Sequence, residues 1–382
     1  MPLFGKRQEA REPAPIIKPI FRKFREYWVP GTPTGLAFCN IQGKDGLIMS
    51  AMNARGLTAM TVEGEKLWTF DTGGTVFSLA TANFGGQRVI LAGSQAKVFA
   101  ISESGHELWQ YQMPETGSKI TKLTLSAGRF TQTSAKRYGY NDVYRLTPGK
   151  FEGEDAVLAV AGWQYAYEGP QIISSKGEQI CALKRKALGK QYGLLILATL
   201  IDFSPRGDAV LAVVSEVSFS IMKEVSVIKK DGTIEKKLKF KIYHAPKDTY
   251  VKGGFQDKYR GKLVGGKFGE TDVCVLGTPD TRSVAAISLD GDQLWNYETA
   301  YANDINAGIN DIALGSILGQ PVAVIGTFNH YLHIVTKDGR RLEMWAYPTN
   351  ITDVAVGKIG EKDAIAVGLY NGQVFTYTAE HS

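Results

Sequence analysis

A short segment that recurs along the chain decides its fold, and the first copy reads Gly64-Glu65-Lys66-Leu67-Trp68-Thr69-Phe70. Further copies lie at 105–111 and 291–297, and a copy with one extra residue lies at 339–347. Because side chains alternate along a strand, the Trp and the aromatic residue two positions later face the same side. The copies at 291–297 and 339–347 each begin at the Gly of an Asp-Gly pair, and such pairs are typical of tight hairpin turns. Each copy therefore predicts a strand that follows a turn.

A second repeated element is a short apolar run that ends in a small residue. It recurs about seven times, from Leu47-Ile48-Met49-Ser50 to Ala364-Ile365-Ala366-Val367-Gly368. Such runs are typical of strands buried on both faces. Trp68 and Trp109 are 41 residues apart, which is the period of a propeller blade. We therefore predict an all-β, seven-bladed β-propeller of four-stranded antiparallel blades.

The end of the chain indicates how the ring closes. The last repeat ends after three strands, and Arg25-Glu26-Tyr27-Trp28 resembles the missing fourth one. We expect residues of about 24–29 to complete the last blade and Trp28 to behave as a core residue. The predicted organisation is a basic, Pro-containing arm at 1–23, one propeller domain at 24–378 with an insert of about 129–150 in the third blade, and a tail at 379–382.

Five of the six tryptophans occupy equivalent repeat positions. One aromatic ring per repeat is what packing between blades requires, so we interpret them as structural. These residues are Trp28, Trp68, Trp109, Trp295 and Trp345.

The repeat resembles the PQQ-like (quinoprotein-like) β-propeller repeat, whose blades carry a Gly-x-x-Leu-Trp strand. The segments Asp311-Ile312-Ala313-Leu314-Gly315 and Asp353-Val354-Ala355-Val356-Gly357 also resemble the FG-GAP-type blades of integrin α and BBSome-subunit propellers. The resemblance implies a propeller over about 350 residues but does not imply one function, because propellers have many roles. The chain has no adjacent cysteine pair, so no quinone or calcium ligand is transferred from PQQ-dependent dehydrogenases.

Composition indicates a folded protein of a reducing compartment. The 382 residues carry a net charge of +6 and three widely spaced cysteines, a pattern unlike a disulfide framework. No apolar run is long enough to span a membrane, and no apolar segment follows the first basic residues as in a secretory signal. We expect a cytoplasmic location.

No catalytic motif is visible in the sequence. Strings typical of serine hydrolases, P-loop NTPases, dinucleotide enzymes and zincins do not occur. His330 and His333 are the only neighbouring histidines, and positions three apart on a strand face opposite sides. We therefore expect no catalytic residue, no metal site and no cofactor, although an enzyme with an unmarked site at the channel mouth remains a less favoured reading.

Loops at one rim of a propeller converge, so equivalent loop positions become neighbours. Trp, Tyr and Arg dominate protein-binding hot spots, and several occur at these positions, although ordinary polar loops have the same composition. The candidate partner-binding loop residues are Arg55, Trp163, Tyr165, Arg282, His330, Tyr331 and Tyr370.

Basic residues cluster in the third and fourth repeats, where cations interleaved with aromatic residues suit nucleic acid. Lys-rich edge strands also limit aggregation without any ligand. The candidate basic patch holds Arg129, Lys136, Arg137, Lys184, Arg185, Lys186, Lys229, Lys230, Lys236 and Lys237. The N-terminal arm alternates apolar and cationic residues and is expected to dock on protein rather than on an anionic membrane.

These observations favour a non-catalytic β-propeller scaffold that mediates protein–protein interactions within a larger cytoplasmic assembly. The alternative is a nucleic-acid or ribonucleoprotein-associated propeller that uses the basic patch.

Overall fold

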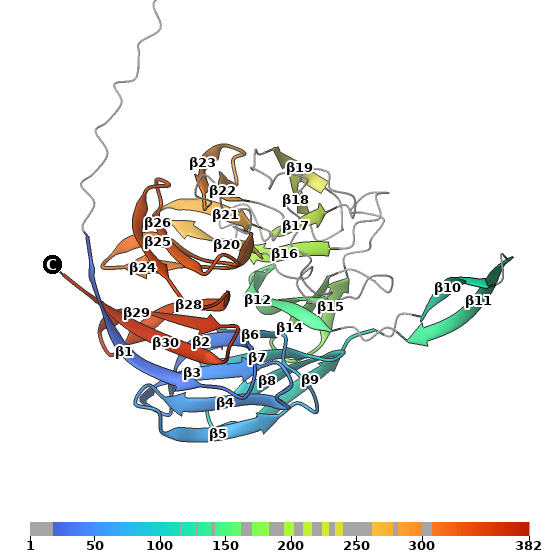
Figure 1. The fold of residues 1–382 in the computed structure, drawn as a ribbon, viewed down its shortest axis with the longest axis horizontal. Helices are drawn as coiled ribbons and strands as arrows, with labels where there is room; N and C mark the ends of the chain where they lie inside the picture. Colours follow the sequence, from blue (N-terminus) through green and yellow to red (C-terminus); the bar gives the residue numbers. More distant parts are fainter. Residues whose placement is uncertain are drawn as a thin grey trace, which may run out of the picture.

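The computed structural model describes residues 18–114, 117–126, 129–138, 142–161, 170–182, 195–201, 209–215, 224–228, 234–239, 262–277, 282–299 and 308–381. Within these ranges all regular structure is β, and no described helix could cross a membrane. The strands form four-stranded antiparallel sheets that are arranged around a centre (Figure 1). The prediction of an all-β propeller with four-stranded antiparallel blades is confirmed.

Seven such sheets, numbered here as blades, occur in the described residues. The strands of each blade are given from innermost to outermost. Blade one holds β2 (Pro33–Ile41), β3 (Lys44–Ala51), β4 (Gly56–Thr61) and β5 (Lys66–Asp71), and blade two holds β6 (Ser78–Phe84), β7 (Gln87–Ser94), β8 (Lys97–Ser102) and β9 (Glu107–Gln112). Blade three holds β12 (Val143–Phe151), β13 (Glu154–Ala161), β14 (Gln171–Ser174) and β15 (Gln179–Ala182), and blade four holds β16 (Leu195–Ile201), β17 (Ala209–Ser215), β18 (Glu224–Ile228) and β19 (Ile234–Lys239). Blade five holds β20 (Lys262–Phe268), β21 (Thr271–Gly277), β22 (Ser283–Ser288) and β23 (Gln293–Glu298), and blade six holds β24 (Ile309–Ile317), β25 (Gln320–Thr327), β26 (Tyr331–Thr336) and β27 (Arg341–Ala346). Blade seven holds β28 (Ile351–Ile359), β29 (Lys362–Leu369), β30 (Gln373–Glu380) and β1 (Ile20–Trp28).

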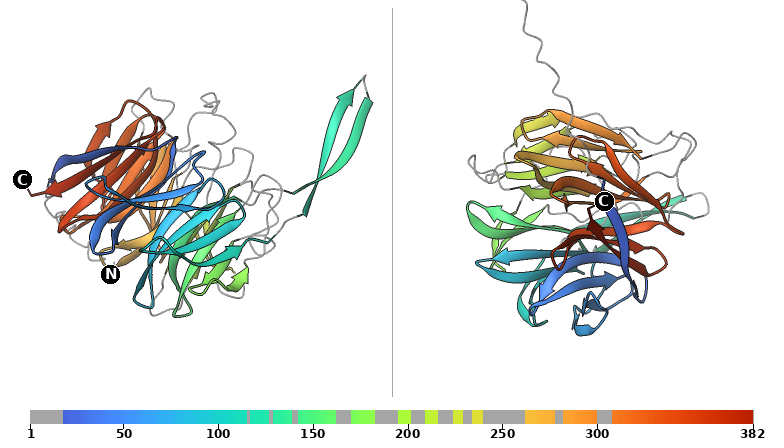
Figure 2. Two further views of the ribbon diagram at one scale, coloured as in Figure 1. Left: turned by 90° about the horizontal axis from the view of Figure 1, so that it is seen from below. Right: turned by 90° about the vertical axis from the view of Figure 1, so that its left-hand side faces the viewer.

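The innermost strands contact one another in chain order, and β28 of the last blade contacts β2 of the first. β1 pairs antiparallel with β30, from Ile20 opposite Glu380 to Trp28 opposite Gln373. The expected pairing of residues 24–29 is therefore present, but β1 begins earlier, at Ile20, and β30 extends to Glu380. The first and last described strands thus lie in one blade (Figure 2).

Apolar clusters between neighbouring blades form the core. The second strand is largely buried in every blade for which its burial is described, as its apolar sequence predicts. Ile48 and Ile90, for example, are 0% exposed and share one cluster between blades one and two. Equivalent clusters join the other neighbours, including Leu36 and Val374 of the first and last blades. Burial between flat sheets stabilises the fold at roughly 25 cal/mol per Å² of apolar surface.

Tryptophan side chains connect one blade to the next. The indole N–H groups of Trp68, Trp109 and Trp295 donate to the backbone carbonyls of Glu103, Ser175 and Lys337, at 2.9, 2.8 and 2.9 Å respectively. Each acceptor lies two residues before the turn glycine of the following blade, and the indole covers that glycine. The structural interpretation of these three residues agrees with their contacts.

Trp345 and Trp28 differ from this pattern. Trp345 packs edge-on against Phe21 of β1, with ring centroids 4.9 Å apart. Trp28 is 63% exposed, so the expectation that it is a core residue is wrong. Its neighbour Tyr27 is 6% exposed, and its hydroxyl donates to the carbonyl of Val62 at 2.6 Å. Arg25, in contrast, stands at the register position of the other tryptophans and lies against the turn glycine Gly64. The side chains of the strand therefore alternate in the opposite sense to the expected one, so that Tyr27 faces the neighbouring blade and Trp28 faces solvent.

The insert of the third blade lies earlier in the chain than expected. Residues 143–150 of the expected insert form most of β12, the innermost strand of that blade. The additional element is a hairpin of β10 (Gly117–Ser126) and β11 (Arg129–Tyr138), which projects away from the ring (Figures 1 and 2).

Candidate partner-binding face

The five candidate loop residues in the described chain all lie between the second and third strands of their blades, or directly beside that turn. Because all blades have the same strand order, these loops share one face of the propeller. The residues come from the consecutive blades five, six, seven and one, as Arg282, His330 with Tyr331, Tyr370 and Arg55. Trp163 and Tyr165 lie outside the described residues. We call this surface the loop face.

Tyr370 and Arg55 are strongly exposed members of the loop face. Tyr370 is 57% exposed, and its loop is held in place because its backbone N–H donates to the Asn350 carbonyl at 2.9 Å. The side chain of Arg55 is 74% exposed and forms a 3.6 Å ion pair with Asp71. Exposed pairs of this kind contribute little to stability, so both side chains are available to a partner.

Arg282 is more tightly held. Its guanidinium lies 3.3 Å from the Glu298 carboxylate, with 27% of the side chain exposed. The Arg282 carbonyl accepts hydrogen bonds from the backbone N–H and hydroxyl of Thr299, at 2.8 and 2.9 Å. The position of Arg282 is therefore fixed by β23 before any partner binds.

His330 and Tyr331 form the turn into β26. His330 adopts a φ of 72°, a conformation uncommon for a residue with a side chain. The backbone N–H of Tyr331 donates to the Thr327 hydroxyl at 3.1 Å. These bonds hold the turn, and the exposed His330 side chain lies on the loop face.

His333, which follows on β26, belongs to the interior. It is 1% exposed, and its Nδ1 lies 3.0 Å from the Tyr297 hydroxyl. Burial, together with the positive charge of Arg341, lowers the pKa of His333 to about 4. His333 is buried and His330 is exposed, so the two imidazoles do not form a metal site together. No group of three metal-ligating side chains occurs in the described residues.

A group of charged side chains on the innermost strands was not predicted as a site. Lys262 of β20 forms an ion pair with Asp311 of β24. One carboxylate oxygen of Asp311 accepts from the Val354 backbone N–H at 2.9 Å, and Asp353 accepts from the Leu36 N–H at 2.7 Å. Each carboxylate thus binds the backbone of the next blade.

Burial raises the pKa of Asp353 well above its usual value, and the neighbouring Asp311 carboxylate raises it further. Burial also lowers the pKa of Arg145, an effect opposed by the charges of Asp311 and Asp353. The signal in the sequence was the recurrence of Asp at one repeat position, in Asp311-Ile312-Ala313 and Asp353-Val354-Ala355. These groups join blades rather than form an open site, because each carboxylate is used by a backbone donor.

The expected basic patch is not assembled in the described structure. Arg129, Lys136 and Arg137 lie on β11 of the projecting hairpin, whereas Lys236 and Lys237 lie on β19 of the fourth blade. Lys236 donates to the Leu289 carbonyl of the next blade at 3.2 Å, in the place where other blades use Trp. The remaining members, Lys184, Arg185, Lys186, Lys229 and Lys230, lie outside the described residues.

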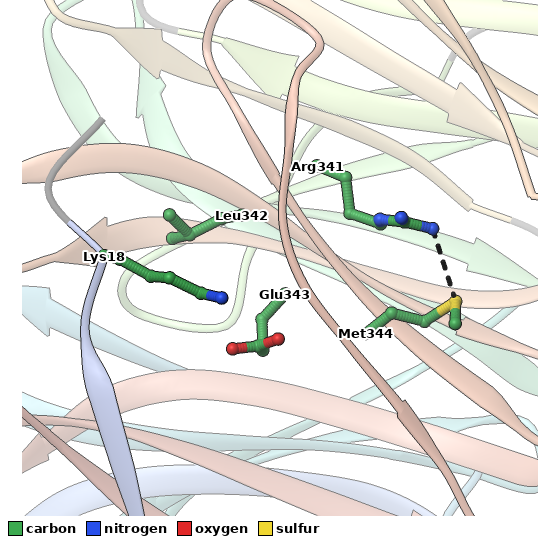
Figure 3. A pocket seen from close by; sticks show the side chains of 5 residues that line it. All are labelled: Lys18, Arg341, Leu342, Glu343 and Met344. Atoms are coloured by element: carbon green, nitrogen blue, oxygen red, sulfur yellow. Dashed lines mark hydrogen bonds between the residues drawn. The ribbon is translucent and has the colours of Figure 1, made fainter. Parts of the chain in front are cut away.

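A shallow groove occurs on another part of the surface. It has a volume of about 450 Å³ and is lined by Lys18, Arg341, Leu342, Glu343 and Met344. Figure 3 shows the Lys18 side chain directed toward Glu343 of β27, whereas the Arg341 side chain points toward Met344, with its guanidinium 3.9 Å from the Met344 sulfur. None of these residues belongs to the loop face.

Comparisons with known proteins agree with the fold. A family model described as "Outer membrane protein assembly factor BamB" matches residues 32–162. No curated protein matches the chain. Two solved structures of BBS1N in complex with ARL6DN, one soaked with mercury and one with lead, are similar to it, with TM-scores of 0.62 and 0.63 and 9% identity. The first match covers 96% of this chain and 99% of the other, and the second covers 95% and 98%. The chain is therefore a β-propeller whose residues 32–162 resemble the family that the matching model describes and whose fold resembles that of BBS1N.

Proposed function

We propose that this protein is a non-catalytic interaction propeller, which binds a protein partner through its loop face within a larger cytoplasmic assembly. The observation that carries the proposal is the similarity over nearly the whole chain to BBS1N, a propeller solved in complex with the protein ARL6DN. At 9% identity the likeness concerns fold alone, so the partner of this chain need not resemble ARL6DN.

The loop face supports a protein partner. It combines exposed Tyr370 and Arg55 with Arg282, which is already positioned by Glu298. Tyr and Arg are enriched among the residues that contribute most binding energy. Arg282, held by Glu298 and Thr299, loses little side-chain entropy on binding, which favours affinity.

We further propose that the predicted domain of residues 24–378 acts as one closed ring of seven blades. Its limits are widened to Ile20 and Glu380, where β1 begins and β30 ends. Pairing of β1 with β30 and contact of β28 with β2 support this closure. A closed ring has no open first or last blade and holds the loops of blades five to one in fixed positions.

The test is affinity purification from the native host, followed by mass spectrometry. We expect the wild-type protein to retain a stoichiometric protein partner after nuclease treatment and a high-salt wash. Combined Arg55→Ala, Arg282→Ala and Tyr370→Ala should remove that partner without altering the melting temperature by more than a few degrees, because Arg55 and Tyr370 are exposed and Arg282 loses only a partly exposed ion pair with Glu298.

The matched control changes three exposed residues beside the turns between first and second strands, on the opposite face: Gln87→Ala, Glu270→Ala and Glu361→Ala. This variant should retain the partner. Loss of the partner in the control only, or partners that disappear with nuclease, would overturn the proposed function.

A further inference from the structure

The projecting hairpin is structurally separate from the blades. β10 and β11 form their own two-stranded sheet and pair with no other strand of the described chain. The ladder is regular over ten residue pairs, from Gly117 opposite Tyr138 to Ser126 opposite Arg129. Figures 1 and 2 show it extending away from the ring. Because an isolated two-stranded hairpin is marginally stable in water, a ligand that binds it would also stabilise it.

The charge of this element is entirely of one sign. Residues 117–138 contain five cationic side chains, Lys119, Lys122, Arg129, Lys136 and Arg137, and no Asp or Glu. Lys119 stands directly opposite Lys136 in the ladder, and Arg137 follows next to it. Like charges at directly opposed positions destabilise a strand pair. An anionic ligand would remove this repulsion.

The cations are spread along the hairpin rather than gathered at one end. Lys119, Lys136 and Arg137 belong to the ladder pairs near the ring, Lys122 to the middle, and Arg129 to the pair beside the terminal turn. At about 3.4 Å per residue, this is a basic ribbon of roughly 30 Å. A ribbon of this length matches an extended polyanion better than a single anionic group.

We propose that the β10–β11 hairpin binds the phosphate backbone of double-stranded nucleic acid. A two-stranded β-ribbon fits the major groove of a duplex. Phosphates are contacted by Lys and Arg and also by Ser and Thr, and the hairpin carries seven Ser/Thr residues between its cations. This activity is additional to the proposed protein interaction and uses a different part of the molecule.

The position of Arg129 favours a duplex over a membrane. Leu125 and Phe130 form the ladder pair next to Ser126 and Arg129, so the turn end carries apolar residues as well. Inserting that end into a bilayer would also carry the Arg129 charge toward the hydrocarbon region, which costs several kcal/mol at the bilayer centre. Lys119 and Lys136 lie on one face of the ribbon and Lys122, Arg129 and Arg137 on the other, and a groove has a phosphate strand along each of its two sides.

The experiment measures binding of the full-length protein to a mixed-sequence DNA duplex and an RNA duplex over a series of salt concentrations. If all five cations contact phosphates of the DNA duplex, the logarithm of the association constant falls with the logarithm of salt with a slope of about −4 to −5. Changing the five cations to Gln should weaken binding to at least one duplex by about 100-fold or more at moderate salt and flatten the slope.

A charge-matched control separates this site from general surface charge. Lys44→Gln, Lys66→Gln, Lys176→Gln, Lys267→Gln and Lys358→Gln remove the same total charge from exposed positions on the blades. This variant should bind within about threefold of the wild type. A third variant, with residues 115–141 replaced by a short Gly-Ser linker, keeps the blade strands and should also lose duplex binding.

Equal duplex binding by the wild type and both hairpin variants would overturn the proposal. So would binding of the hairpin only to anionic vesicles or to an acidic peptide, with none to either duplex. The two proposals can fail separately, because the loop-face variant should keep duplex binding and the hairpin variants should keep the protein partner.

Discussion

At the scale of single residues, the contact of an indole with a turn glycine joins neighbouring blades. A Cβ at Gly105 would lie 2.8 Å from Cδ2 of Trp68, whereas a Cβ at Gly43 would have no atom within 4 Å. Both glycines have a φ of +81°. Adding a side chain strains the backbone equally at the two positions, because their φ angles are the same. Only at Gly105 would the added Cβ also collide with Trp68.

We predict that Gly105→Ala lowers the free energy of unfolding by at least about 1 kcal/mol more than Gly43→Ala, because Trp68 must move. Chemical denaturation of both variants measures the difference. Equal destabilisation would show that the indole contact contributes nothing.

Tyr27 and Trp28 provide a second comparison of neighbours. Tyr27→Phe removes the buried hydrogen bond to the Val62 carbonyl and should cost about 1 kcal/mol. Trp28→Ala should change stability by less than about 0.5 kcal/mol, because the side chain is 63% exposed. Thermal unfolding distinguishes the two, and a larger loss for Trp28→Ala would contradict the register of β1.

His333 gives the structure a defined pH dependence. Its pKa is lowered from 6.5 to about 4 by burial, so the unfolded chain binds a proton in this range and the native protein does not. Stability from this group is therefore complete above pH 6.5 and is lost as pH falls toward 4.

We predict that His333→Gln flattens the decline of the unfolding free energy in this range, whereas changing the exposed His106 to Gln leaves it unaltered. Denaturation at a series of pH values is the measurement. Parallel curves for wild type and His333→Gln would exclude this explanation.

At the scale of elements, the repeats predicted the second and fourth strands well because those strands carry the most regular sequence. The innermost strands have a less regular apolar pattern and are therefore harder to predict from the sequence. They face the centre and hold charged residues such as Arg145, Lys262 and Asp311 in place of apolar ones. Residues 143–151 include Pro148, which favours the prediction of a loop there. Residues 119–125, in contrast, alternate between polar and apolar side chains as a strand does. The insert was therefore placed too late in the chain.

Strand β1 is the element on which the last blade depends. Phe21 packs against Trp345, Tyr27 is buried, and Lys23 lies 4.5 Å from the centre of the Phe375 ring. We predict that deleting residues 1–29 lowers the free energy of unfolding by about 3 kcal/mol or more relative to deleting residues 1–17, which leaves β1 in place. Calorimetry of both truncations tests the contribution of β1, and equal melting temperatures would contradict it.

At the scale of the whole molecule, the sequence predicted which loops share a face but not the charged group between blades. The loop positions follow from the repeat alone, because equivalent positions in a propeller lie on one face. Asp353 and Leu36, in contrast, are joined across the chain ends, and Lys262 meets Asp311 only when two innermost strands are adjacent. Such contacts depend on the ring and not on local sequence.

The central claim is that the loop face holds a protein partner, and site-specific photo-crosslinking in the native host tests it most directly. A photoreactive amino acid at Tyr370 should crosslink one protein in high yield, and the same group at Glu361, exposed on the opposite face, should not. Crosslinking from Glu361 alone, or from neither position, would contradict the account.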